Sequence, residues 1–455
     1  MAERKYFGTD GIRGRSNAFP ITADCVLRIG MAVGEHFRTD DANHHRVVIG
    51  KDTRRSSYMV ENALTAGLTA VGMNVHLLGP IPTPAVGLLT RSMRADLGIM
   101  ISASHNPFED NGMKFFGPNG YKISKDEEER IEERIDASID PVVPSEIGRA
   151  RRIDGGIGRY VEFAKTTFPK SLRLSGLRVV VDCANGAAYR VAPDVLWELG
   201  GDVVPIAVSP DGANINYRCG ATDTRRACQK VIETRADVGI CLDGDADRVV
   251  LIDERGRAVD GDQALGLLAK RMKSEGRLAH NTLVASIMSN FALERHLSEQ
   301  GISIQRTDVG DKHVIAEMLR GGYSLGGEQS GHVIMAKHST TGDGLITALQ
   351  LLAILVEEGR PASEIVDVFE PLPQILQNVR VGSFAAVSNC NALKRTIESH
   401  RAKLNGRGRI VVRNSGTELV VRIMVEGTDA SEIRHIVDDI DASIVSASRI
   451  ANSVE

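Results

Sequence analysis

The sequence predicts an α/β protein with three related mixed α/β domains, whose sheets are largely parallel, and a C-terminal α+β domain, around a central cleft. Two observations predict this architecture. A pattern of apolar strand, polar turn and helix recurs three times, and the pattern changes after about residue 370. A length of 455 residues is enough for about three to four domains. A hydrophobic content of 42%, with 45 glycines, is typical of a globular protein with many turns.

The repeated pattern has three strands in each copy. The first strand runs into a polar turn and a helix, at 46–57 ("RVVIGKDTRRSS"), 177–188 ("LRVVVDCANGAA") and 282–293 ("TLVASIMSNFAL"). A short second strand follows the helix, at 70–78, 198–206 and 299–307. A third strand ends in a polar loop, at 95–107, 236–248 and 322–332. Strands that alternate with helices favour parallel sheets, and such sheets bind ligands at the carboxyl ends of their strands. We therefore expect the three loops to face one cleft.

Changes in composition mark the expected domain boundaries. The predicted domains are residues 1–150, 156–256, 257–370 and 371–455. A helix is expected at 125–139, because Ser124 and Glu127 form a capping box and isoleucines recur at helical spacing. The last domain alternates strand-like segments such as "RIVVRNSGTELVVRIMVEG" with helical stretches, which indicates an α+β fold.

Composition argues against several classes of partner. A net charge of −4 gives no general basic field for nucleic acid. The N-terminal segment lacks the apolar core of a signal peptide, and no apolar run approaches the roughly 18 residues of a membrane helix. The six cysteines contain no C-x-x-C pair, which favours reduced thiols in a cytoplasmic protein.

The loop "DGDADR" is the strongest candidate for a metal site. Asp243, Asp245 and Asp247 alternate along an extended segment and so point to one side. Crowded carboxylates raise each other's pKa unless a cation neutralises them, and hard oxygen ligands favour Mg²⁺. The alternative is an Asp-Gly turn whose aspartates cap backbone groups. The fuller ligand spacing of an EF-hand is missing.

Ser104, in "ISASHNP" (101–107), is the candidate phosphoryl carrier. No G-x-S-x-G elbow surrounds it, and an extended chain would point the adjacent His105 the opposite way, so a hydrolytic triad is disfavoured. Taken alone, Ser104 would be an ordinary turn serine. Beside the expected metal loop, a phosphoserine held by Mg²⁺ fits better. Ser102 lies on the same side but deeper in the strand.

Three further motifs carry polar side chains. "RNSGTE" (413–418) combines Arg413, hydroxyls and a glycine turn, which is typical either of an anion nest or of a plain hairpin turn. "GGEQSGH" (326–332) suits sugar hydroxyls, or its histidine is bound locally. "GTDGIRG" (8–14) lacks the context of a dinucleotide motif, and no Walker A lysine motif supports ATP chemistry.

These motifs, in this order, resemble those of the α-D-phosphohexomutases along nearly the whole chain. "KYFGTDGIRG" and "ISASHNPFEDNGMKFF" are similar to the branch that acts on glucosamine phosphates. The resemblance implies a four-domain, heart-shaped fold. It also implies interconversion of glucosamine 6-phosphate and glucosamine 1-phosphate, through a phosphoserine enzyme and a hexosamine bisphosphate that also acts as activator, for UDP-N-acetylglucosamine synthesis. The expected partners are small sugar phosphates; a homodimer is one alternative, and the sequence does not give the oligomeric state.

The resemblance also implies roles for individual residues. One Mg²⁺ per chain would be held by the phosphate of Ser104 and by Asp243, Asp245 and Asp247. The other groups expected at the reacting centre are Asp10, Arg13, His105, Lys114 and Arg248. The sugar and its non-reacting phosphate would be held by Glu328, Ser330, His332, Arg413, Ser415, Gly416, Thr417 and Arg422.

Three residues depart from the family pattern. Ala246 stands where glycine is frequent, Lys312 where arginine is common and Leu419 where proline usually follows. They leave room for a paralogue with a phosphomannomutase or phosphoglucomutase preference. A hydrolase that passes the phosphate from Ser104 to water and an inactive sugar-phosphate sensor are the alternatives of other classes.

Overall fold

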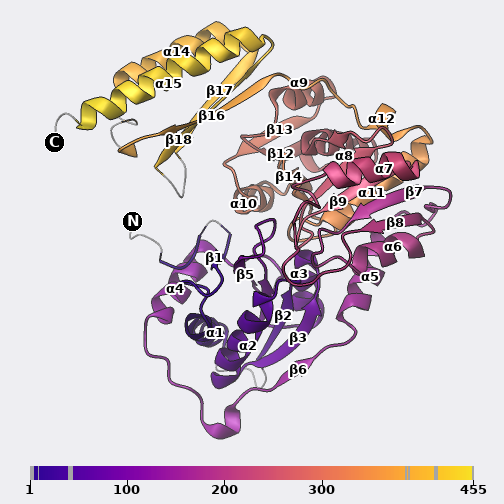
Figure 1. The fold of residues 1–455 in the computed structure, drawn as a ribbon, viewed down its shortest axis with the longest axis vertical. Coiled ribbons are helices and arrows are strands. Elements are labelled where there is room, and N and C mark those ends of the chain that lie inside the picture. The colour runs from indigo at the N-terminus through magenta and orange to yellow at the C-terminus, as the bar shows by residue number, and fades with distance from the viewer. Residues whose placement is uncertain are drawn as a thin grey trace. The chain divides into compact units, whose positions relative to one another are not determined.

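The computed structural model describes residues 5–8, 10–38, 45–384, 387, 390–414 and 419–452, without the side chains of 449–452. The chain forms two compact units (Figure 1). The first unit comprises Met1–Ser286 with Gln305–Val368, and the second comprises Ile287–Ile304 with Phe369–Glu455. The predicted division of the first unit into separate domains stays a prediction.

The N-terminal sheet has six strands in the order β1-β5-β4-β2-β3-β6. Strand β2 pairs in parallel with β3 and β4, whereas β5 returns antiparallel to β4. The strands are β1 (Ile12–Arg15), β2 (Arg46–Lys51), β3 (Asn74–Pro80), β4 (Leu97–Ile101), β5 (Asp110–Phe116) and β6 (Ala150–Arg152). The helices are α1 (Ala23–Phe37), α2 (Ser56–Ala70), α3 (Thr83–Ser92), α4 (Lys125–Ile135), the short 3₁₀ helix η1 (Pro144–Glu146) and α5 (Gly156–Thr167).

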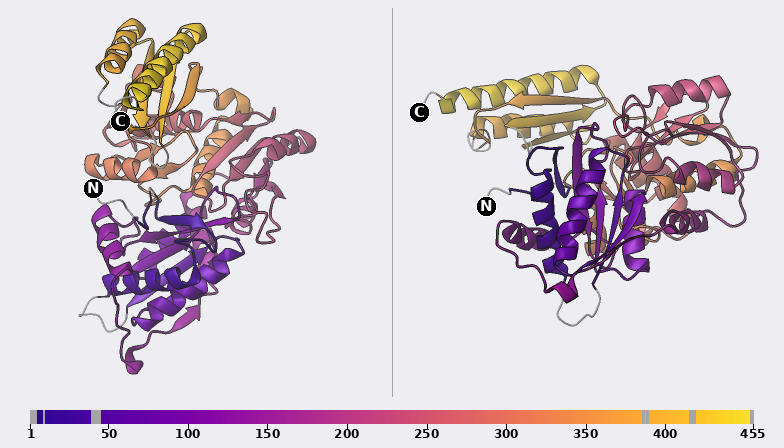
Figure 2. Two further views of the ribbon diagram at one scale, coloured as in Figure 1. Left: turned by 60° about the vertical axis from the view of Figure 1, so that its left-hand side comes forward. Right: turned by 60° about the horizontal axis from the view of Figure 1, so that its bottom comes forward.

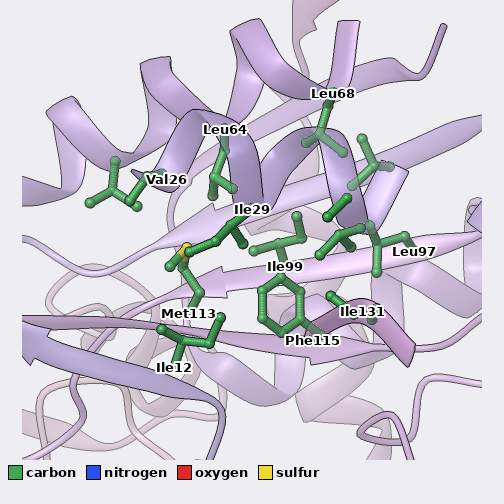
Figure 3. Close-up of a cluster of buried hydrophobic side chains, with 14 of the residues drawn as sticks. Ile12, Val26, Ile29, Leu64, Leu68, Leu97, Ile99, Met113, Phe115 and Ile131 are labelled. Carbon is green, nitrogen blue, oxygen red and sulfur yellow. The ribbon is translucent and has the colours of Figure 1, made fainter. Parts of the chain in front are cut away.

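The core of this part lies between the sheet and helices α1 and α2 (Figure 3). Ile29 of α1, Leu64 of α2 and Ile99 of β4 are fully buried there. The two helices approach closely at Gly67, where an added β-carbon would lie 2.2 Å from the carbonyl oxygen of Leu27. This packing fixes β2, β4 and β5, which carry polar residues at their ends.

The second sheet has the order β11-β10-β9-β7-β8. Strand β7 is parallel to β8 and β9, and β10 returns antiparallel to β9. The elements are β7 (Arg178–Asp182), α6 (Val191–Glu198), β8 (Asp202–Ile206), α7 (Arg225–Thr234), β9 (Val238–Leu242), β10 (Val249–Asp253) and β11 (Ala258–Val259).

The third sheet has the order β13-β12-β14-β15, with β12 parallel to β14 and β15 antiparallel to β14. Its strands are β12 (Thr282–Ser286), β13 (Ser303–Thr307), β14 (Leu325–Gly327) and β15 (Val333–Met335). The helices are α8 (Gly261–Ser274), η2 (Ala279–Asn281), α9 (Phe291–Glu299), α10 (Asp311–Gly321), α11 (Gly344–Glu358) and α12 (Ala362–Ile365).

The second unit contains an antiparallel sheet in the order β16-β18-β17. Helices α14 and α15 lie side by side against this sheet (Figure 2). The elements are β16 (Gln374–Arg380), α14 (Asn391–Leu404), β17 (Gly408–Asn414), β18 (Val420–Gly427) and α15 (Ala430–Asn452).

The predicted fold class is confirmed, with three α/β sheets and a C-terminal α+β part. The expected helix at 125–139 has the predicted capping box but ends at Ile135, and a turn begins at Asp136. Within the described residues, no helix is long and apolar enough to cross a membrane.

Candidate active site

Three hairpin loops of the first unit carry the predicted polar motifs at equivalent positions. The Ser104 loop joins β4 to β5, the aspartate loop joins β9 to β10, and the "GGEQSGH" loop joins β14 to β15. The strand before each loop (β4, β9 or β14) is parallel to the first strand of the same repeat (β2, β7 or β12). The strand after the loop runs antiparallel to the strand before it. The loops therefore leave the carboxyl ends of the parallel strands, where α/β sheets bind ligands.

Ser104 is buried and has a left-handed backbone, with φ of +51°. This conformation costs a residue with a β-carbon about 1–2 kcal/mol, so neighbouring contacts must hold it. The amide of Ser104 donates to Ser102 Oγ at 2.9 Å, and Ser102 Oγ donates to Asp52 Oδ2 at 2.7 Å. Ser102, which the sequence placed deeper in the strand, thus supports the Ser104 loop directly.

The three aspartates form a buried acidic cluster whose ligand atoms lie within 4.8 Å of one another. Ser104 Oγ donates to Asp243 Oδ2 at 2.7 Å, so the serine lies at the edge of the cluster. Burial, followed by the charges of Asp247 and Asp245, raises the pKa of Asp243 well above its usual range.

The cluster fits a divalent cation. Asp245 Oδ1 and Asp247 Oδ1 are buried and have no hydrogen-bond partner among the described residues. Buried carboxylate oxygens are costly without a partner, and a hard cation is the partner that oxygen ligands prefer. Three carboxylates and one hydroxyl supply such a ligand set.

Lys114 on β5 joins the first hairpin to the aspartates. Its buried ammonium donates to Asp245 Oδ2 at 2.7 Å and to Asp247 Oδ2 at 2.8 Å. Burial would lower the pKa of Lys114, but Asp245, Asp247 and Asp10 outweigh it and raise the pKa well above its usual value. Burial also opposes the ionisation of Asp247, yet Lys114 holds the pKa of that carboxyl below its usual range.

Asp10 and Arg13 lie beside this lysine and form an ion pair with each other. Burial would raise the pKa of Asp10, but Lys122, Lys114 and Arg13 hold it well below its usual range. Lys122, whose side chain is almost wholly buried, also pairs with Asp311 at the start of α10. Asp10 is therefore ionised, and a cationic network surrounds it.

His105 lies closer to Ser104 than the sequence predicts. Its Nδ1 is 3.4 Å from Ser104 Oγ. The expectation that the two side chains point in opposite directions is wrong, because it assumed an extended chain and Ser104 is left-handed. Burial, followed by the charges of Arg248 and Arg13, lowers the pKa of His105 to about 4. The imidazole is therefore neutral at neutral pH.

The backbone of the "GGEQSGH" loop pairs with that of the aspartate loop through an isolated antiparallel β-bridge between Arg248 and His332. Glu328 accepts a hydrogen bond from the amide of Gly310 at 3.0 Å, and Ser330 is exposed. His332 is buried, and neither ring nitrogen has a hydrogen-bond partner among the described residues. Arg248 Nε lies 3.8 Å from Asp247 Oδ1. The structure thus brings the predicted groups of all three loops together.

Arg413 and Arg422 belong to the second unit. They are directly opposite each other on β17 and β18, so their side chains share one face of the sheet. Both line a cavity of about 270 Å³, together with apolar residues that include Leu376 and Met424. Ser415, Gly416 and Thr417 lie outside the described residues.

The three residues that depart from the family pattern lie in different surroundings. Ala246 has φ of +58° and a buried methyl group. The left-handed backbone costs about 1–2 kcal/mol, and methyl burial offsets roughly 0.8 kcal/mol of this. Lys312 pairs with the buried Glu128 of α4. Leu419 is 55% exposed and comes directly before β18.

Several residues at the site were not predicted from the sequence. Thr83, at the start of α3, donates its hydroxyl to Asp245 Oδ2 and its amide to the Asp245 carbonyl. Arg54 and Asn216 bind carbonyl groups of the Ser104 loop. The only available signal was position, because Thr83 and Arg54 both follow parallel strands of the first repeat.

Four consecutive segments of the chain match the domains of a known family. Residues 4–140, 158–256, 260–372 and 376–443 match, in order, domains I, II and III and the C-terminal domain of the phosphoglucomutase/phosphomannomutase family. The chain belongs to this phosphoglucomutase/phosphomannomutase family of phosphohexomutases, which are isomerases.

Individual relatives are more specific. The chain is 57% identical to the phosphoglucosamine mutase of Cereibacter sphaeroides over 444 residues, which are 98% of this chain and 99% of the relative. The phosphoglucosamine mutase of Paracoccus denitrificans is also 57% identical over 444 residues, with the same coverage. A solved phosphoglucomutase/phosphomannomutase family protein from Burkholderia thailandensis has a TM-score of 0.82 at 26% identity, covering 98% of both chains. The N-acetylphosphoglucosamine mutase of Aspergillus fumigatus, solved with GlcNAc-6P and magnesium, has a TM-score of 0.67 at 18% identity, covering 98% of this chain and 96% of that one.

Proposed function

We propose that the protein interconverts glucosamine 6-phosphate and glucosamine 1-phosphate through a phosphoserine at Ser104 and a bisphosphate intermediate, and so supplies UDP-N-acetylglucosamine synthesis. The observation that carries the proposal is the 2.7 Å hydrogen bond from Ser104 Oγ to Asp243 within a buried acidic cluster. The sugar is assigned from the relatives at 57% identity, whose names specify glucosamine.

The acidic cluster would hold Mg²⁺ through Asp243, Asp245, Asp247 and the group on Ser104. A bound Mg²⁺ would neutralise charge on the transferring phosphoryl group. The unpartnered oxygens of Asp245 and Asp247 support this assignment. Magnesium fits the set better than a soft metal because every ligand is oxygen.

The cationic side chains would orient the transferring group. Phosphoryl transfer depends on positioning and charge stabilisation more than on covalent chemistry, and Lys114 and Arg248 are permanent cations beside the acidic loop. Arg13 is held by Asp10 and adds a third cation. The neutral imidazole of His105, 3.4 Å from Ser104 Oγ, can accept or return a proton there.

The substrate would be held at two places. Glu328 and Ser330, with His332, would bind sugar hydroxyls. Arg413 and Arg422, with residues 415–417, would bind the phosphate that is not reacting. Two phosphate sites are needed because the bisphosphate must turn around before it can return the second phosphoryl group to Ser104.

A turnover assay tests the proposal against its rivals. Glucosamine 6-phosphate, glucose 6-phosphate and mannose 6-phosphate would each be offered with Mg²⁺ and a trace of the bisphosphate activator, while 1-phosphate and free phosphate are followed. We expect the highest kcat/KM for the amino sugar, without free phosphate. A preference for a neutral hexose would contradict the assigned substrate, and free phosphate alone would indicate a hydrolase.

The proposal also places the protein in the cytoplasm. Each of the six cysteines, all within the described ranges, is a free thiol, which suits a reducing compartment. Burial raises the pKa of Cys219 to about 12, so this thiol is protonated and unreactive.

A further inference from the structure

We propose that Arg54 is a positioning residue for phosphoryl transfer, because its guanidinium holds the Ser104 loop in the conformation that presents Ser104 Oγ to the aspartates. The inference rests on the proposed role of Ser104 and adds a residue to it. Arg54 lies in the turn after β2 and is fully buried. No hydrogen bond that the structure describes joins it to the three aspartates of the acidic cluster.

The guanidinium binds the loop at three carbonyl oxygens. Arg54 Nη2 donates to the carbonyl of Ser104 at 2.8 Å and to that of Asn106 at 2.9 Å. Nη1 donates to the carbonyl of Pro107 at 2.5 Å. One rigid, planar group therefore fixes the loop along four residues, beginning at Ser104 itself.

The carboxylate of Asp52 binds Arg54 and is also linked, through Ser102, to the amide of Ser104. Arg54 Nε donates to Asp52 Oδ2 at 2.8 Å, and the Arg54 amide donates to Asp52 Oδ1 at 2.9 Å. Asp52 Oδ2 also accepts from Ser102 Oγ, which accepts from the amide of Ser104. Ser104 is thus held on its amide side through Ser102 and on its carbonyl side by Arg54.

This support has a geometric purpose. Ser104 needs positive φ to reach Asp243, and a residue with a β-carbon adopts that conformation only when its surroundings impose it. Asn216 Nδ2 adds hydrogen bonds to the carbonyls of Ser104 and Asn106, at 2.9 and 3.1 Å. Arg54 and Asp52 form a buried ion pair, so the arginine adds little net charge at the serine. Its contribution is orientation.

Arg54→Lys tests this role because it keeps the charge but loses the planar fork. We expect kcat to fall by on the order of 10²-fold, the effect of displacing a reacting group by about 1 Å. KM for glucosamine 6-phosphate should stay within about threefold, because the proposed sugar and phosphate ligands are elsewhere. The rate at which the bisphosphate phosphorylates Ser104, followed by mass spectrometry, should fall by the same factor as kcat.

Ser102→Ala provides a second variant if Arg54→Lys does not fold. It removes the hydroxyl between Asp52 and the Ser104 amide and should slow Ser104 phosphorylation by roughly tenfold, since it loosens the same loop. The two effects should be less than additive in the double variant, because both act on one structure. Arg409→Lys is the matched control. Arg409 is a mostly buried arginine in the second unit that donates to Glu426 and to the Ser289 carbonyl, and its variant should keep Ser104 phosphorylation unchanged.

Phosphorylation of Ser104 at the wild-type rate in folded Arg54→Lys or Ser102→Ala would overturn the inference. An equal loss in Arg409→Lys would also overturn it, since the effect would then be general. A wild-type protein that never phosphorylates Ser104 would instead refute the proposed function.

Discussion

Ser104 Oγ donates a hydrogen bond to Asp243 Oδ2 at 2.7 Å, although 139 residues separate them in the chain. The bond joins the polar hairpin of the first sheet to that of the second. Both side chains are buried, so the hydroxyl has exchanged water for a carboxylate. A bound cation would offset the negative charge of the buried carboxylates and of a phosphoryl group carried on Ser104, as the proposed function requires.

Ser104→Ala should reduce mutase turnover by at least about 10³-fold, because the proposed covalent intermediate cannot form. The affinity for glucosamine 6-phosphate, measured by calorimetry, should change little, since the proposed sugar ligands remain. Ser274→Ala, an exposed serine at the end of α8, is the control and should be fully active. Turnover near the wild-type rate in Ser104→Ala would exclude the phosphoserine mechanism.

Asp245→Asn should weaken the binding of Mg²⁺, because it removes one anionic oxygen of the proposed ligand set. We expect the Mg²⁺ concentration for half-maximal activity to rise by at least roughly tenfold, with a matching loss of Mg²⁺ affinity in calorimetry. Asp223→Asn, which removes an acid paired with the exposed Arg225, is the control. An unchanged Mg²⁺ titration would place the metal elsewhere.

The sequence predicted the parallel strands of each sheet well because each is a continuous apolar run buried on both faces, a pattern that one segment carries by itself. Buried runs such as "VVIG" (47–50) and "GICL" (239–242) are separated by helices at regular spacing, and they became β2 and β9. The return strands β5, β10 and β15 did not enter the repeat that was recognised. They are antiparallel and follow the polar loops, where a tertiary partner decides the structure more than periodicity does.

The predicted residues of the three polar loops lie together, yet the contacts between them required the structure. The direction of the His105 side chain depends on the positive φ of Ser104. The residue type at position 104 does not predict this backbone conformation. Thr83 contacts Asp245, and Lys122 contacts Asp10, only because segments far apart in the chain fold against each other. Sequence motifs therefore predicted which polar groups lie together, and long-range packing supplied the residues that orient them.

Lys122→Met should destabilise the protein by about 3–5 kcal/mol, because it leaves the partly buried carboxylates of Asp10 and Asp311 without their shared cation. Adding Asp311→Asn to this variant should recover part of the loss, since one uncompensated charge is removed. Denaturant unfolding of the full chain would measure the change in the free energy of unfolding for the single and for the double variant. Lys125→Met, which removes an exposed lysine 3.9 Å from Glu129, is the control and should cost at most about 0.5 kcal/mol. Equal stability of the Lys122 and Lys125 variants would contradict a structural role for the Asp10–Lys122–Asp311 bridge.

Asp343→Asn should stabilise the protein progressively, relative to the wild type, as pH rises from 5 to 8. Asp343 caps α11 by accepting from the amide of Ile346 at 2.9 Å, and the Tyr160 hydroxyl lies 2.8 Å from both carboxylate oxygens. Burial raises the pKa of Asp343 from 3.8 to about 7, despite these hydrogen bonds. The folded protein therefore keeps a proton that the unfolded chain has already lost.

The raised pKa fixes the sign of the effect. The stability that comes from the protonated carboxyl is fully present below about pH 4, and it is lost as pH rises through 7, where the folded state also ionises. Between pH 5 and 7 the loss is about 2–3 kcal/mol, at 1.36 kcal/mol for each pH unit. Asparagine does not titrate, so the difference in Tm between Asp343→Asn and the wild type should move in favour of the variant over this range. Asp223→Asn, at a partly buried acid whose pKa is lowered chiefly by its hydrogen bond to Arg225, should show a constant difference. A difference for Asp343→Asn that is constant, or that moves toward the wild type as pH rises, would mean that Asp343 is already ionised at pH 5.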